Sequence, residues 1–307
     1  MARFVYGVTF FQLFQLTVSF GGEATRLRIV IVSDGENSWR RGANLSEGCR
    51  NNVMFLKSFL NDALDGKETR YTLNGDPENI TEQVALNGNA VTPNSVMQFL
   101  KGPEFIVDPS ESILFYYCGH GAIEDRKESP NFNQHFFLMG MAGPSDKGIL
   151  ARNDVRNVLM GKRPKALFIL ADACSNYQAI EPVAGAPAPT PDYQGFYQLF
   201  YGAEGIVDIL AAAPGQRAWF DNTGGMFTTA LIEMLYLPQT KLDLNRDGQI
   251  TWKEVFPILQ STTNEHFQIL KRNARVPAAA ASDPSSILNF KTQVPAYYYL
   301  AEWPKAQ

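Results

Sequence analysis

Apolar positions recur along the chain with two alternating periods, which predict strands that alternate with helices. Short runs rich in β-branched and aromatic residues predict buried strands, at residues 27–33, 69–73, 112–117, 166–171 and 206–212. Apolar residues at helical spacing predict helices between them, at residues 49–64, 94–100, 153–160 and 225–237. This alternation is typical of an α/β fold, in which a mostly parallel sheet has helices on both faces.

The first 24 residues have the pattern of a secretory signal peptide. One positive charge precedes an apolar run over residues 4–20, and small residues follow where a signal peptidase would cut. Gln12 and Gln15 interrupt the run, which leaves open a buried strand or helix of the domain and disfavours a transmembrane anchor. We therefore expect export to the periplasm or the extracellular space, and a cytoplasmic location if the run belongs to the domain.

The composition is that of a globular protein and excludes several functions. Apolar residues make up 45% of the chain and charged residues only 19%, which excludes intrinsic disorder. The net charge is −4, so no polybasic surface is available and nucleic acid is not an expected partner. The three cysteines, Cys49, Cys118 and Cys174, are too widely spaced for a disulfide framework or a zinc knuckle.

Reactive side chains gather where two of the predicted strands end. His120 follows strand 112–117, between two glycines that would let a substrate approach the backbone, and Cys174 follows strand 166–171. If these strands are parallel neighbours, both residues emerge at the same edge of the sheet. An imidazole there could take the thiol proton and later protonate a leaving amine, and the backbone N–H groups of Gly121 and Cys174 could form an oxyanion hole. A buried structural thiol and a histidine in a turn are the alternative.

Two sequence motifs at these positions resemble those of caspases and metacaspases. Residues 115–121, Phe-Tyr-Tyr-Cys-Gly-His-Gly, resemble the histidine motif, and residues 169–175, Ile-Leu-Ala-Asp-Ala-Cys-Ser, resemble the nucleophile motif. His120 and Cys174 are 54 positions apart, close to the caspase spacing of about 50. Further matches, in the order found in the family, are residues 45–53, 213–218 and 225–231. The resemblance implies a caspase-like fold with a six-stranded, mostly parallel sheet, and the activity of a cysteine endopeptidase.

The resemblance also implies a role for each motif residue. His120 would be the general base and acid, Cys174 the nucleophile, and Asp172 the carboxylate of a pocket that accepts Arg or Lys. The second acidic position of the metacaspase pocket falls on Asn52, so half of the pocket's charge is missing. The Gln-Ala-Cys-Arg-Gly motif of caspases is absent, so cleavage after Asp is not expected. We expect a monomeric peptidase that acts on peptides or proteins, with a preference for basic residues before the scissile bond.

A second interpretation is that the chain is a catalytically inactive caspase-fold module for calcium binding or protein interaction. Asn52 and the unusual Ser175-Asn176 after the nucleophile favour this interpretation, whereas the intact pair of His120 and Cys174 favours catalysis. The other cysteines and histidines are expected to be structural, with Cys49 and Cys118 in the core and His135 and His266 as surface or capping residues.

Residues 243–254, Asp-Leu-Asn-Arg-Asp-Gly-Gln-Ile-Thr-Trp-Lys-Glu, fit the loop of an EF-hand. Such a loop holds Ca²⁺ through oxygen ligands, here the side chains of Asp243, Asn245, Asp247, Thr251 and Glu254 and the carbonyl of Gln249. Gly248 supplies the sharp turn of the loop, and helices are expected on both sides. The alternative is an Asp/Asn/Gly turn that only caps a helix. Calcium is the cofactor expected from the sequence, and no organic cofactor is expected.

These observations divide the chain into four parts. A signal peptide is expected at residues 1–24 and a caspase-like catalytic domain at residues 25–238. The EF-hand-like loop and its following helix occupy residues 239–275. Residues 276–307 form a C-terminal extension, and its aromatic end predicts that it packs on the domain.

Overall fold

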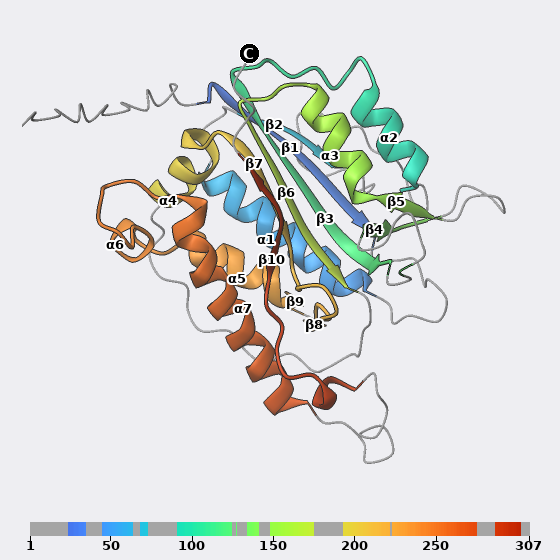
Figure 1. Ribbon diagram of the computed structural model, residues 1–307, viewed down its shortest axis with the longest axis vertical. Helices are drawn as coiled ribbons and strands as arrows, with labels where there is room; N and C mark the ends of the chain where they lie inside the picture. The colour runs from blue at the N-terminus through green and yellow to red at the C-terminus, as the bar shows by residue number, and fades with distance from the viewer. Residues whose placement is uncertain are drawn as a thin grey trace, which may run out of the picture.

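A twisted, mostly parallel β-sheet runs through the middle of the computed structural model (Figure 1). Its strands are β1 (Arg26–Asp34), β2 (Glu68–Thr72), β3 (Glu111–Ile123), β4 (His135–Leu138), β5 (Ile149–Ala151), β6 (Ala166–Cys174), β7 (Gly205–Leu210) and β10 (Ala296–Ala301). Six of them follow the order β10-β7-β6-β3-β1-β2, in which only β10 is antiparallel to its neighbour. β4 and β5 extend the sheet by antiparallel pairing at the end of β3.

The structure describes residues 24–34, 45–63, 68–72, 91–124, 127, 134–140, 148–174, 193–221, 223–274 and 286–301. The expected signal peptide, apart from Ala24, lies outside the described residues. Among the helices of the described residues, none is both long enough and apolar enough to cross a lipid bilayer.

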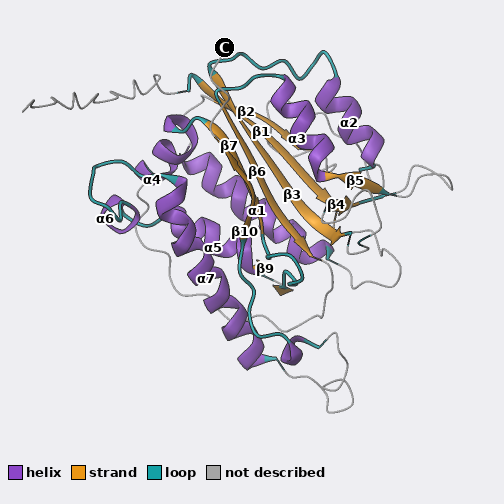
Figure 2. Cartoon of the chain, in the orientation of Figure 1, coloured by secondary structure: helices purple, strands orange, loops and turns teal. Residues whose placement is uncertain are grey.

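Helices cover both faces of the sheet (Figure 2). One face carries α1 (Ser46–Ala63), α4 (Gln194–Tyr197), the π-helical η2 (Gln198–Gly202), α5 (Met226–Leu235), α6 (Gln239–Leu242) and α7 (Trp252–Asn273). The other face carries α2 (Pro93–Lys101) and α3 (Arg152–Gly161), and a short 3₁₀-helix, η3 (Ile287–Asn289), follows α7. Successive side chains of a strand point to opposite faces, so Tyr116 of β3 packs toward α1 while Phe115 packs toward α2 and α3. The structure therefore confirms the predicted α/β fold, a mostly parallel sheet with helices on both faces.

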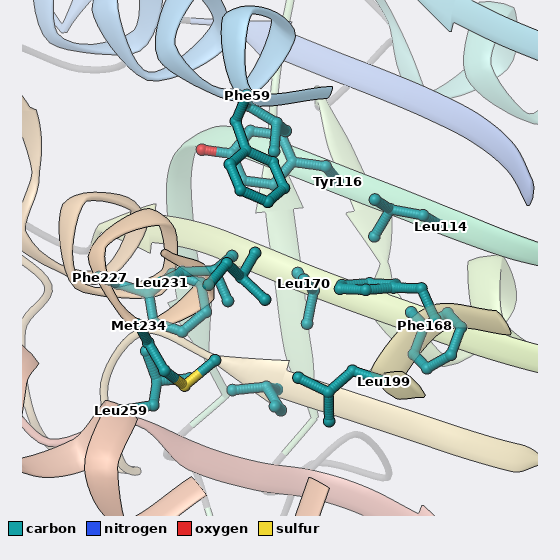
Figure 3. Close-up of a cluster of buried hydrophobic side chains, with 14 of the residues drawn as sticks. Phe59, Leu114, Tyr116, Phe168, Leu170, Leu199, Phe227, Leu231, Met234 and Leu259 are labelled. Atoms are coloured by element: carbon teal, nitrogen blue, oxygen red, sulfur yellow. The ribbon is translucent and has the colours of Figure 1, made fainter. Parts of the chain in front are cut away.

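The main hydrophobic core lies between the sheet and the α1, α5 and α7 helices (Figure 3). Phe59 of α1 makes edge-to-face contacts with Phe196 and Tyr236, at ring-centroid distances of 5.4 and 5.1 Å. Burial of each large apolar side chain contributes roughly 1.5–3 kcal/mol to folding. This packing fixes α1 against the sheet, and with it the polar residues on the inner face of α1.

Every strand and helix predicted from the hydrophobic pattern is present, but β3 is longer than predicted. The predicted strand ends at residue 117, whereas β3 continues through Gly119, His120 and Gly121 to Ile123. Glycine weakens an isolated strand, but here the neighbouring strands supply pairing partners along the whole extension. The histidine motif is therefore part of the sheet and does not lie in a turn.

The C-terminal part of the described chain returns to the sheet. The side chain of Gln293 donates a hydrogen bond to the carbonyl of Ala211 at 3.2 Å and accepts one from the amide of Trp219 at 2.9 Å. β10 then pairs with β7, and Tyr297 stacks on Phe256 of α7 with ring centroids 3.8 Å apart. The chain after α7 thus forms one edge of the sheet and holds the segment that follows β7.

Candidate active site

β3 and β6 bring His120 and Cys174 together. The two strands are parallel neighbours, and their register pairs the Cα atom of His120 with that of Cys174. Paired residues on neighbouring strands lie about 4.8 Å apart, and this pair lies toward the carboxyl ends of both strands. The structure describes Cys174 through its backbone only. It nevertheless places the two residues that the sequence assigned to catalysis side by side.

The imidazole of His120 has the environment that a general base needs. Its side chain is buried, and Nε2 has no hydrogen-bond partner among the described residues. Burial lowers the pKa of His120, because an imidazolium ion loses its hydration there. The ring is therefore neutral at neutral pH and can accept a proton. The hydroxyl of Tyr117 donates to the carbonyl of His120 at 2.9 Å and so helps to fix the backbone that carries the ring.

The glycines on either side of His120 are needed for packing inside the protein, a role that the sequence did not indicate. A Cβ atom added at Gly119 would lie 2.6 Å from the hydroxyl of Tyr117. A Cβ atom added at Gly121 would lie 2.9 Å from the Cβ of Ala173 and from Nε2 of His135. Both positions therefore exclude a side chain because neighbouring residues already fill the space.

Asp172 and Asn52, the expected pocket residues, belong to a buried polar cluster. Nδ2 of Asn52, on α1, donates a hydrogen bond to Oδ2 of Asp172 at 3.0 Å. Thr228 donates to the same oxygen from its hydroxyl at 2.6 Å and from its amide at 3.1 Å. All three side chains are fully buried, with 0% of their surface exposed. The structure brings the two predicted residues into contact, but it leaves neither of them at a surface.

Thr228 is the member of this cluster that the sequence did not indicate. The helix α5 begins after a short hairpin of β8 (Phe220–Asp221) and β9 (Gly224–Gly225), and Gly225 has no side chain to cap it. Asp172 takes the place of a capping residue, because its carboxylate accepts the free N–H of Thr228 in the first turn. Asp172 and Thr228 are 56 positions apart, so no local sequence pattern reveals their contact.

Burial raises the pKa of Asp172 to about 6, although the hydrogen bonds from Thr228 and Asn52 act in the opposite direction. These bonds end on one carboxylate oxygen, and the other, Oδ1, has no hydrogen-bond partner among the described residues. The hydrogen bonds therefore offset only part of the rise in pKa that desolvation causes. The carboxylate carries its full negative charge only above about pH 6.

The raised pKa of Asp172 predicts a pH-dependent stability. Between about pH 4 and pH 6 the unfolded chain releases the Asp172 proton before the folded chain does, so stability falls as the pH rises through this window. Across this window Asp172 lowers the free energy of unfolding of the wild type by about 3 kcal/mol. We expect Asp172→Asn to remove this pH dependence. Urea unfolding of both proteins at pH 4 and pH 7 measures it, with the exposed Asp154→Asn as control. An equal slope in wild type and Asp172→Asn would contradict the prediction.

His135 is a core residue and not the surface or capping residue that the sequence suggested. It lies on β4, is 3% exposed and packs edge-to-face on Phe137 with ring centroids 5.5 Å apart. Burial, with a smaller contribution from Arg152, lowers its pKa well below the ordinary value. Strand alternation explains the difference, because His135 and Phe137 point to the same side of β4. His266 is partly exposed and pairs with Glu233 at 2.7 Å, as a surface histidine does.

Cys49 and Cys118 are buried, as expected, and both are free thiols. Their Sγ atoms are 2.9 Å apart, and Nδ2 of Asn52 lies 3.3 Å from Sγ of Cys118. The two thiols therefore border the polar cluster around Asp172.

The EF-hand-like loop has the backbone turns that its sequence predicts. Asp243 accepts hydrogen bonds from the amides of Asp247 and Gly248, at 3.1 and 2.9 Å. Glu254 accepts one from the amide of Asn245 at 3.2 Å, which brings the two ends of the loop together. Glu254 also forms a capping box with Thr251 at the start of α7. Among the described residues, no three His, Cys, Asp or Glu side chains are close enough together to hold a metal ion. Calcium binding stays a prediction.

The protein has a mostly parallel sheet with helices on both faces, and a histidine and a cysteine are paired near the ends of its central strands. This is the arrangement of a caspase-type protein. A family model described as the caspase domain matches residues 35–247, more than half of the chain. The chain therefore belongs to the caspase-domain family of cysteine peptidases, whose substrates are proteins.

Solved structures also match this chain. One is the crystal structure of caspase-1 from Spodoptera frugiperda, with 13% sequence identity and a TM-score of 0.48, over 90% of this chain and 86% of that chain. No curated protein matches the chain significantly.

Proposed function

We propose that the protein is a cysteine endopeptidase that hydrolyses peptide bonds through an acyl-enzyme. The observation that carries this proposal is the pairing of His120 with Cys174 across β3 and β6. His120 takes the proton of the Cys174 thiol, the thiolate attacks the peptide carbonyl, and the imidazolium gives its proton to the leaving amine. A water molecule that loses a proton to His120 then hydrolyses the thioester and restores the thiol.

The backbone N–H groups of Gly121 and Cys174 are the proposed oxyanion donors in this mechanism. Both residues lie in strands of the sheet, Gly121 opposite Phe137 of β4 and Cys174 opposite His120. Donors that neighbouring strands hold in place, and that are not used in hydrogen bonds of the sheet, need no rearrangement as negative charge develops on the substrate, which is the source of their effect.

A preference for Arg or Lys before the scissile bond is part of the proposal. The Oδ1 atom of Asp172 has no partner among the described residues, which supports its use as an acceptor for a guanidinium or ammonium group. Asn52 adds no charge, so the preference rests on one carboxylate. Gly225 lies directly against that carboxylate, where an added Cβ would collide with it. Asp172 is 0% exposed, so a substrate side chain can reach it only if a neighbouring part of the chain moves.

A peptide library tests the activity and its specificity together. The purified protein is incubated with peptides that carry every residue before the scissile bond, with and without Ca²⁺, and Cys174→Ala serves as the blank. We expect cleavage that depends on Cys174 and is fastest after Arg and Lys. Cleavage after other residues would contradict the proposed role of Asp172 but would still support the proposed peptidase activity.

The second candidate function is an inactive caspase-fold module for calcium binding or protein interaction. The observation that favours it is the complete burial of Asp172 and Asn52, which leaves neither side chain exposed to a substrate. The same library distinguishes the two functions, because an inactive module cleaves no peptide under any condition.

Calcium binding by the loop of residues 243–254 is proposed as a modulating or stabilising feature. The side-chain oxygens of Asp243, Asn245, Asp247 and Glu254 are the hard donors that Ca²⁺ prefers, and the hydrogen bonds described above bring the two ends of the loop together. We expect Glu254→Gln to raise the Kd for Ca²⁺ at least about tenfold, because a charged bidentate ligand becomes neutral.

Titration calorimetry with CaCl₂ measures this change. Asp154→Asn, an acidic-to-amide change on α3, is the matched control and should leave the heat of binding unchanged. If wild type gives no heat of binding, the loop is only a helix-capping turn.

A further inference from the structure

Cys49 and Cys118 form a closely placed pair that the proposed peptidase mechanism does not use. Cys49 lies on α1 and Cys118 on β3, and their Sγ atoms are 2.9 Å apart. A disulfide requires 2.03–2.05 Å, so the sulfurs need to approach by less than about 1 Å. The two side chains already point toward each other, although 69 positions separate them in the sequence.

We propose that Cys49 and Cys118 are joined by a disulfide when the chain folds in the presence of a disulfide donor. Sequence spacing alone does not suggest this bond, because the fold brings the two cysteines together. The inference does not depend on the peptidase activity, since neither thiol takes part in the proposed mechanism.

The chemistry is a thiol–disulfide exchange with a small-molecule or protein disulfide as the oxidant. The thiolate of one cysteine attacks the donor disulfide and displaces one donor thiolate, which leaves a mixed disulfide. The thiolate of the second cysteine then attacks the protein sulfur of that mixed disulfide and displaces the other donor thiolate. The protein loses two electrons and two protons, and the donor gains them as two thiols.

Burial determines when this exchange takes place. Cys49 is 1% exposed and Cys118 is 0% exposed, so a donor cannot reach either sulfur in the folded protein. Burial also raises the pKa of Cys49, which disfavours the reactive thiolate. The bond therefore forms during folding, before α1 closes over β3, and a reductant reaches it only when the protein unfolds.

The bond would also fix the polar cluster next to it. Asn52 donates from Nδ2 to both Sγ of Cys118 and Oδ2 of Asp172, at 3.3 and 3.0 Å. The disulfide lies beside this amide. It keeps α1, which carries Asn52, close to β3, which carries Cys118.

The test uses the full chain with Cys174→Ala, which leaves Cys49 and Cys118 as the two remaining cysteines. The protein is refolded in a mixture of reduced and oxidised glutathione, alkylated under denaturing conditions and digested with trypsin without reduction. We expect peptides 42–50 and 102–126 to appear as one linked species that separates on reduction. The thermal midpoint of the oxidised protein should exceed that of the reduced protein by roughly 5–10 °C.

A further variant with Cys118→Ala in the same background is the control, and it should show no shift between oxidised and reduced samples. If that variant does not fold, the comparison of oxidised and reduced Cys174→Ala protein is sufficient by itself. Two alkylated thiols after refolding in glutathione, or a bond only between two chains, would overturn the proposal. Because the readouts are mass and stability, failure of the peptidase proposal leaves them unaffected.

Discussion

Replacement of Cys174 by alanine is expected to lower kcat/KM for any cleaved peptide by at least about 10⁴-fold. In the proposed mechanism the Cys174 thiolate is the attacking group, and the sheet register places Cys174 opposite His120. His120→Ala should cause a loss of similar size, because an uncharged thiol is a poor nucleophile without its base. The double variant should be no worse than either single one, since the two groups act as a unit.

Rates from a fluorogenic peptide measure these effects. His266→Ala is the matched control, because this histidine lies on α7 and pairs with Glu233 at the surface. It should keep its activity within about twofold. Residual activity of Cys174→Ala above one per cent of wild type would show that another group is the nucleophile.

Replacement of Arg152 by methionine is expected to destabilise the fold by about 3–5 kcal/mol. Arg152 and Asp208 are both fully buried, and Nε of Arg152 donates to Asp208 at 2.6 Å. Nη2 donates to the same carboxylate and to the carbonyl of Ile209 at 2.8 Å. Without the guanidinium, the one cation left beside Asp208 among the described residues is Arg156, at 3.3 Å, and the carboxylate is a poorly compensated charge in the core.

Urea unfolding measures this loss, and a second variant identifies its cause. The double change Arg152→Met and Asp208→Leu removes both charges, so it should recover most of the lost stability. Lys165→Met, which breaks a pair with the exposed Glu204 at 3.8 Å, is a control expected to cost less than about 1 kcal/mol. If the double variant is as unstable as the single one, then lost packing, not the uncompensated charge, is responsible.

The sequence predicted the sheet, the helices around it and the pairing of His120 with Cys174, because these depend on local periodicity and on the rule that parallel strands share a carboxyl edge. It did not predict how far β3 extends, because glycine disfavours a strand locally and the extension is stabilised by pairing with β1, β4 and β6, which lie elsewhere in the sequence. The structure overrides local propensity where neighbouring strands supply the hydrogen bonds.

The environment of Asp172 also lay beyond the sequence. The resemblance to metacaspases indicated a pocket residue, but Thr228 at the start of α5 comes from a distant part of the chain and binds its carboxylate. The short strands β4 and β5 were not predicted, since a few residues carry too little periodicity to distinguish a strand from a loop. The burial of His135 follows from that same missed strand.

The position of β10 has a consequence for how the protein is made. β7 is synthesised about 90 residues before the strand that covers its outer edge, because residues 296–301 come last in the described chain. The segments that carry His120 and Cys174 therefore leave the ribosome before β10, the strand that completes the sheet. Until then the backbone N–H and C=O groups along one side of β7 lack their partner strand, and an open strand edge of this kind is a site where another chain can pair.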